Sequence, residues 1–214
     1  MVDGPVVSVR GESYREVDPE IARFTVTALA RDRDRETTLT RLAERAAAVR
    51  VLIDSHAPAV DRRETGELRV RPETRRSGER VVAYHGSVST TVTVTDFTAL
   101  GELMLRLADQ DQVEVAGPWW SLRPDSPAHR EARRAAIDDA LSRAREYAEA
   151  LGARVTALIE LSDTGDMDRP MFARMAYAGG AEAGGAPDLE LDPRPQEVRA
   201  AVHARFAISE PVLH

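Results

Sequence analysis

The residue types that could do chemistry are few in this chain, and they are scattered. Cysteine is absent from all 214 residues, and the 29 basic residues are all arginine. Without thiols or lysine amines, the chain cannot form disulfides, thiolate metal sites or Schiff bases. Five histidines remain as candidate ligands or bases, namely His56, His85, His129, His203 and His214.

The spacing of the histidines does not indicate a site. No HExxH or HxH arrangement occurs, and histidine ligands usually have histidine or carboxylate partners close by. We interpret them as ordinary surface or strand-edge histidines. A Gly-x-Ser-x-Gly elbow and a glycine-rich phosphate loop are also missing. The sequence predicts no catalytic residues, no metal site and no cofactor, and it favours a protein without enzymatic activity.

The two tryptophans, Trp119 and Trp120, are adjacent and follow Gly117-Pro118. If this segment is a strand, the two side chains point to opposite faces, so one lies in the core and the other is more exposed. An exposed tryptophan is a good anchor for a partner or ligand. The alternative is that both rings are half-buried in ordinary packing.

Methionines recur at intervals of four within the segment that follows residue 166. Methionine is a flexible packing residue at adaptable surfaces, so we interpret the segment as an arm laid against the domain or a neighbouring subunit. Thioether binding of Cu(I) is the alternative. The candidate ligand or partner surface therefore consists of Trp119, Trp120, Met167, Met171, Phe172, Met175 and Tyr177.

The charge pattern argues against two classes of partner. The net charge is −7, and the arginines between residues 62 and 80 alternate with acidic residues, whereas nucleic-acid binding needs a basic footprint. No apolar run approaches the roughly 20 residues of a membrane-spanning helix. The N-terminal residues also lack the features of a signal peptide, so we expect a cytoplasmic location.

Strand and helix patterns alternate along the chain and must position these residues. Val6 to Glu16 and Ile21 to Ala30 have the period-two pattern of strands, with turn residues between them, and predict an antiparallel hairpin. A second hairpin is expected from residues 67–71 and 80–95. Further strands are expected at residues 112–116, 155–161 and 197–208.

Three segments have the helical period. The first, residues 35–56, follows the N-cap candidate Asp34, and its apolar stripe is Leu39, Leu42, Ala46, Val49 and Ile53. A short helix follows Asp96. The longest begins at Ser126-Pro127 and ends before Gly152. Alanine stands at nearly every fourth position of this helix, joined on the apolar side by Ile137, Leu141 and Tyr147 and ending at Leu151, which predicts a very close approach to a sheet or another helix.

The resulting order of elements is ββαββαβαββ. It predicts an α+β fold, with a mostly antiparallel sheet of about seven to eight strands and three helices packed on one face. We expect a single domain over residues 5–208, including a long irregular loop at 162–196. Loops of this length within a domain are functional or disordered.

Nearly the whole chain resembles the SIMPL domain family, a domain of unknown function. Residues 7–12 and 17–22 are similar to the first hairpin of that family. The most recognisable stretch runs from Val115 to Asp125 and then from Glu131 to Ala140, and Pro193 to Ala204 is similar to the closing strand. The resemblance implies an α+β fold, frequent homo-oligomerisation and, in some members, a link to envelope or oxidative stress. It supplies no catalytic residues.

Two functional hypotheses follow. The first is a non-enzymatic homo-oligomeric scaffold or binding protein, whose partner is itself. The alternative is a small-molecule binder or enzyme with a cleft under the 162–196 loop, using Trp119 or Trp120, Tyr84 or His85, and an arginine of the second hairpin.

Overall fold

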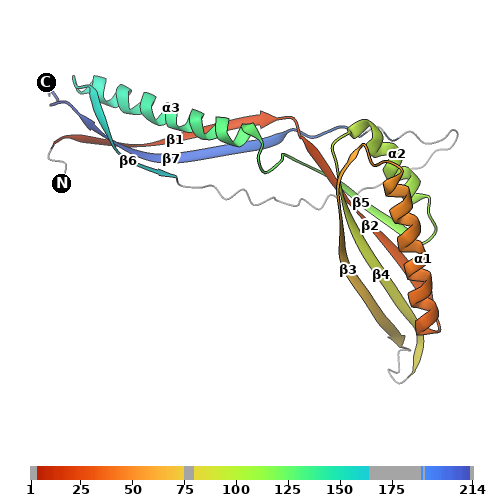
Figure 1. Ribbon diagram of the computed structural model, residues 1–214. Helices are drawn as coiled ribbons and strands as arrows, with labels where there is room; N and C mark the ends of the chain where they lie inside the picture. Colours follow the sequence, from red (N-terminus) through yellow and green to blue (C-terminus); the bar gives the residue numbers. More distant parts are fainter. Residues whose placement is uncertain (1–3, 75–79, 164–188, 190, 213–214) are drawn as a thin grey trace. The chain divides into compact units, whose positions relative to one another are not determined.

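The computed structural model describes residues 4–74, 80–163, 189 and 191–212 (Figure 1). The strands in these ranges are β1 (Val6–Val17), β2 (Ile21–Asp32), β3 (Val60–Thr74), β4 (Val81–Val94), β5 (Val113–Ser121), β6 (Val155–Asp163) and β7 (Gln196–Ile208). The helices are α1 (Arg35–Asp54), α2 (Phe97–Ala108) and α3 (Pro127–Ala150). All strand pairings are antiparallel, and the predicted α+β class and order of elements are confirmed.

The strands are divided between two sheets, whereas the sequence analysis expected one. Sheet β1-β7-β6 with helix α3 forms one compact unit, the three-stranded unit, which comprises the described residues 4–18, 123–163 and 195–212. Sheet β3-β4-β2-β5 with helices α1 and α2 forms the four-stranded unit, which comprises the described residues 19–74, 80–122, 189 and 191–194.

The hairpin predicted from the first two strands does not form. β1 pairs with β7 over its whole length, from Val6 opposite Ala207 to Val17 opposite Gln196. β2 pairs with β4 and β5 instead. The boundary between the two units falls between Asp18 and Pro19, at the residues interpreted as a turn. A period-two pattern shows which face of a strand is buried but not which strand lies beside it, so the prediction was wrong on the partner alone.

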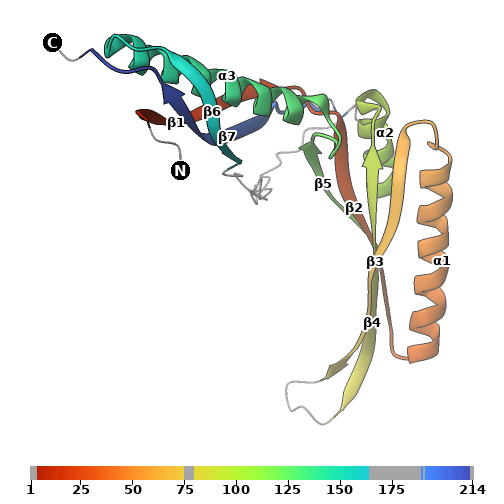
Figure 2. The same ribbon diagram turned by 60° about the vertical axis from the view of Figure 1, so that its left-hand side comes forward.

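The four-stranded unit has its two helices on one face of the sheet (Figures 1 and 2). Alternate residues of β2 point into the core, as predicted: Ala22, Phe24, Val26, Ala28 and Ala30 are all buried. α2 adds Leu100, Leu103 and Leu107, which are fully buried, and α1 adds Val49 and Ile53. Large aliphatic and aromatic side chains therefore fill the space between helices and sheet.

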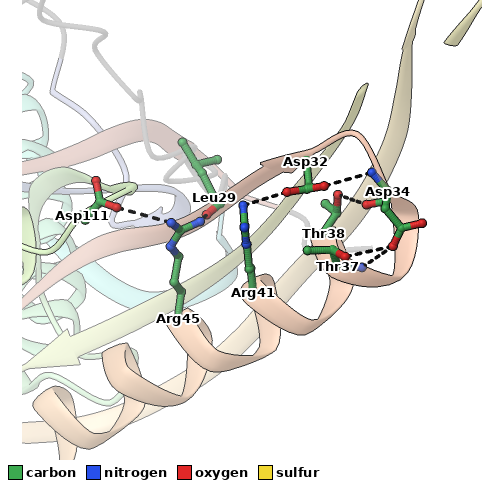
Figure 3. Close-up of polar contacts among 8 residues, drawn as sticks. All are labelled: Leu29, Asp32, Asp34, Thr37, Thr38, Arg41, Arg45 and Asp111. Atoms are coloured by element: carbon green, nitrogen blue, oxygen red, sulfur yellow. Dashed lines mark hydrogen bonds and ion pairs between the residues drawn. The ribbon is translucent and has the colours of Figure 1, made fainter. Parts of the chain in front are cut away.

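Helix α1 is fixed at its start by short-range polar contacts, shown in Figure 3. Asp34 caps the helix, as predicted, by accepting a 2.8 Å hydrogen bond from the Thr37 backbone N–H. Arg41 forms an ion pair with Asp32 at 2.8 Å. Arg45 donates to the carbonyl oxygen of Leu29 at 2.8 Å, so β2 and the helix are held together along two turns.

The apolar stripe predicted for α1 is displaced by one residue at its first turn. Leu39 is 41% exposed, and Thr38 is buried in its place. The Thr38 hydroxyl donates to the carbonyl oxygen of Asp34 at 2.8 Å, which satisfies the buried polar group. The buried positions are thus Thr38, Leu42, Val49 and Ile53, a continuous helical face in which only the residue type of the first is polar.

Candidate interaction surface

Helix α3 begins and ends as the sequence predicts. The Ser126 hydroxyl accepts from the Ala128 backbone N–H, Pro127 occupies the first turn, and Gly152 follows the helix with a φ of +68°. The face toward the sheet consists of alanines, all buried, at positions 128, 132, 136, 140, 144 and 148. An alanine face has no long side chains to hold the helix away from the strands, so the backbones can approach closely.

The closest approach is at Gly11 of β1. A Cβ atom at this position would lie 2.0 Å from the Ala136 carbonyl oxygen and 2.6 Å from the Ala140 backbone nitrogen. No other residue type fits without moving the helix, because backbone atoms on both sides of the gap are fixed by their secondary structure. The prediction of a very close approach is confirmed, and the partner is the sheet.

Polar contacts hold α3 on the β1 side of its sheet. The Glu12 backbone N–H donates to Asp139 Oδ2 at 2.9 Å, and Arg15 pairs with Glu131 at 2.5 Å. The helix therefore packs against β1 and β7, the other strand of its core cluster. Strand β6, at the opposite edge of the three-stranded sheet, is left largely uncovered.

An apolar groove lies between α3 and the uncovered strand β6. Its volume is about 310 Å³. Ile137 is 39% exposed, Leu158 is 55% exposed and Leu161 is 44% exposed, so the groove is open to solvent. Its lining contains no charged residue and comprises Ile137, Ala140, Leu141, Val155, Thr156, Ala157, Leu158, Leu161, Ala204 and Phe206. Such a surface can bind apolar side chains, and the one hydroxyl in its lining, that of Thr156, donates to the Ala207 carbonyl oxygen at 3.1 Å.

Ile137, Tyr147 and Leu151 were predicted on the apolar side of α3 with the alanines, and the prediction of a buried position is wrong for all three. They are exposed, because the alanine face sits so close to the sheet that larger side chains are pushed to the flanks of the helix. Ile137 lies on the flank that lines the groove. Leu158 and Leu161 of β6 were not singled out from the sequence, because the number of strands that a helix covers is not encoded in a local pattern.

The tryptophan pair lies on opposite faces of strand β5 in the four-stranded unit, as the first interpretation states. Trp120 packs against the core, and its ring meets that of Phe97 edge-on at 4.8 Å between centroids. Trp119 is 37% exposed and lies opposite Arg23. A binding role for either ring stays a prediction. The other candidates for this surface, Met167, Met171, Phe172, Met175 and Tyr177, lie outside the described residues.

The strand register brings together one group of titratable side chains in the four-stranded unit. Glu73 of β3 accepts from His85 of β4 at 2.8 Å and from Arg31 Nε of β2 at 2.9 Å. Hydrogen bonds from His85 and Arg31 lower the pKa of the Glu73 carboxyl group. These side chains are part-exposed and paired with one another. We therefore interpret the group as cross-strand pairs that stabilise the sheet.

Other features of the described ranges do not indicate a catalytic site. A polar hollow of about 350 Å³ surrounds the start of α3 at Pro124, His129 and Arg133, where the Ser126 hydroxyl already caps the helix. Within the described part of the chain, no group of three or more histidines and carboxylates is arranged to hold a metal ion. No helix in that part is long and apolar enough to span a membrane.

Comparison with known proteins identifies a family. The model of the SIMPL family, described as a protein of unknown function (DUF541), matches residues 7–206. No curated protein matches the chain. The family carries no described activity, so the surface itself has to supply the functional argument.

Proposed function

The chain belongs to the SIMPL family of proteins of unknown function, and on this premise we propose that it is a non-enzymatic, self-associating scaffold or binding protein. The observation that supports the proposal is the apolar groove between α3 and β6. Three large aliphatic side chains are exposed side by side there, whereas charged residues dominate the rest of the α3 surface. Contiguous exposed apolar surface marks interaction sites in soluble proteins.

The chemistry of the groove favours a protein partner over a substrate. A catalytic cleft needs convergent polar groups at its base, and this groove has the methyl and aromatic groups of Ala204 and Phe206 there. Its open, shallow form suits side chains inserted from a second surface. A small-molecule site under the 162–196 loop remains the alternative, and most of that loop lies outside the described residues.

Light scattering across a concentration series tests self-association. We expect the unaltered chain to form a defined oligomer at micromolar concentration. Replacing Leu158 and Leu161 together by serine should shift the mass toward the monomer, because it removes the two most exposed aliphatic side chains of the groove. Tyr147→Ser is the matched control, since Tyr147 is also exposed on this unit but does not line the groove.

A monomeric unaltered chain at high micromolar concentration would contradict the proposal. An equal loss of mass in the Tyr147→Ser variant would show that the groove is not the contact. A further variant lacking Met167 to Pro187 tests the arm predicted from the sequence. It should lose assembly if that arm contributes to the contact.

A further inference from the structure

In the described ranges the two sheets have four edge strands, and three of them carry charged side chains or proline that oppose pairing with another chain. β1 carries Arg10, Glu12, Arg15 and Glu16, and β3 carries a charge at most of its positions together with Pro72. β5 carries Glu114 and Pro118. Charged side chains and proline on an edge strand are the usual protection against edge-to-edge association.

Strand β6 is the exception as regards charge and proline, and its irregularities are two register shifts against β7, between Val155 and Ala157 and between Leu158 and Glu160. Its residues from Val155 to Ile159 include no charge and no proline. It pairs with β7 on one side, and in the part of the chain that the structure describes its other side has no strand partner. The first charged residue, Glu160, is already paired with Arg205 of β7 at 3.4 Å. The strand with this uncharged, proline-free edge also borders the apolar groove.

We infer that β6 pairs antiparallel with β6 of a second copy of this chain, about a two-fold axis close to Ala157. The inference rests on the proposed self-association and names its contact. With the axis at Ala157, Val155 lies opposite Ile159 of the second copy, and Thr156 lies opposite Leu158. The two three-stranded sheets then join as one sheet of order β1-β7-β6-β6-β7-β1.

Charge favours this partner over the other edges of a second copy. Pairing β6 with itself brings five uncharged residues of one strand against five uncharged residues of the other. Pairing with β1 or β3 would place the apolar strand against arginine and glutamate side chains. A two-fold contact is also closed, because each copy uses the same patch and no free β6 edge is left to extend the assembly.

The position of the axis also relates the groove to the outer edge of β6. A two-fold axis perpendicular to the sheet keeps both α3 helices on one face. Leu158 and Leu161 face α3, since their partners Phe206 and Ala204 point into the core of the unit. Leu158 of each copy therefore lies beside the axis and close to Leu158 of the other copy, whereas Leu161, four residues from the axis, stays within the groove of its own copy.

Cysteine cross-linking tests the register directly, because the chain has no cysteine of its own. Ala157 is exposed, pairs with Ala207 and belongs to neither core cluster of this unit, so Ala157→Cys leaves the core unchanged. Opposite residues of an antiparallel pair have Cα atoms about 4.5 to 5.5 Å apart, within the disulfide range of about 4.4 to 6.8 Å. We expect diamide to convert most of this variant into a covalent dimer that dithiothreitol reverses.

Ser8→Cys is the matched control. Ser8 is exposed on the same face of the same sheet, but on the opposite edge strand, β1. The Ala157→Cys variant should give at least tenfold more dimer than this control at equal concentration. A second variant, Ala157→Glu, should weaken self-association at least tenfold by placing two carboxylates across the axis, whereas Ser8→Glu should leave it unchanged.

The outcomes separate the inference from the proposed function. If the unaltered chain is an oligomer and Ala157→Cys gives no more dimer than Ser8→Cys, the β6 contact is wrong and self-association stands. If the unaltered chain is a monomer, both are overturned. Far-UV circular dichroism of each variant confirms that it is folded before cross-linking is scored.

Discussion

In both units helices pack against one face of a sheet, but the side chains between helix and sheet differ in size. In the four-stranded unit, leucine, isoleucine and phenylalanine fill the space between two helices and the sheet. In the three-stranded unit, a single helix presents alanines, and its backbone reaches that of β1 at Gly11. An alanine face packs a helix closely against a sheet but covers few strands, which leaves part of the sheet exposed. The candidate interaction surface lies where that cover ends.

Gly11 and Gly86 show how closely the helices approach the two sheets, because each glycine lies in a strand beneath a helix. At Gly11, an added Cβ would meet backbone atoms of α3, the nearest at 2.0 Å. At Gly86, in β4, it would meet only side-chain ends, Leu42 Cδ2 at 3.0 Å and Thr38 Cγ2 at 3.3 Å. Side-chain ends can rotate away, whereas helix backbone moves only with the whole helix.

Gly11→Ala should have the largest effect. We expect it to destabilise the three-stranded unit by about 3 kcal/mol, the upper range for forcing an extra methyl group into a packed core. Urea unfolding followed by circular dichroism at 222 nm reports on the helices of both units, α3 in the three-stranded unit and α1 and α2 in the four-stranded unit. Tryptophan fluorescence reports on the four-stranded unit alone, because both tryptophans lie in β5.

The same pair of signals tests the prediction of a single domain over residues 5–208. If the units unfold as one, both signals shift together in the Gly11→Ala variant. If they unfold separately, the fluorescence midpoint stays in place, and only the part of the circular dichroism transition that comes from α3 moves to lower urea. An unchanged midpoint in both signals would contradict the backbone contact at Gly11.

Gly86→Ala should cost less, about 1 kcal/mol, since Leu42 and Thr38 can adjust by a few tenths of an ångström. Because Gly86 lies in the four-stranded unit, the tryptophan fluorescence midpoint is the signal to follow. A loss equal to that of Gly11→Ala would mean that side-chain and backbone neighbours resist an added methyl group equally, and the proposed distinction between the units would fail.

Much of the local structure was predictable because its causes are local. The caps at Asp34, Asp96 and Ser126, the glycine after α3 and the inward face of β7 all depend on residues within a few positions of each other. The division into two sheets was not, because Val9 finds its partner Ala204 almost two hundred residues away. Nothing near β1 distinguishes β7 from β2 as a neighbour.

The candidate surface was predictable only in part, for the same reason. The alanine spacing indicated a close contact for α3, but the groove depends on which strands lie beneath the helix. Leu158 would have been buried had α3 been centred on β6 instead of β1 and β7. Its exposure is a property of the assembled sheet, so sequence reasoning could find the helix face but not the leucines beside it.

The smallest expected effect is a difference in pH dependence between the units. Tyr14 in β1 donates to Glu16 at 2.9 Å, and this hydrogen bond is the main cause that raises its pKa to about 12. Its folded pKa is above the unfolded value of about 10, so its contribution to stability is complete below pH 10 and is lost as the pH rises toward 12.

The contribution of Glu73, in the four-stranded unit, to stability depends on pH in the opposite direction. Its folded pKa is lowered, so its contribution is present above the ordinary carboxyl value of about 4.5 and is lost as the pH falls. Urea midpoints measured against pH should therefore decline at the alkaline end through Tyr14 and at the acidic end through Glu73. Tyr14→Phe should reduce the decline at the alkaline end alone. Glu73→Gln should reduce the decline at the acidic end alone. Because both side chains are part-exposed, each slope should be shallow, and equal slopes in all three proteins would remove this difference between the units.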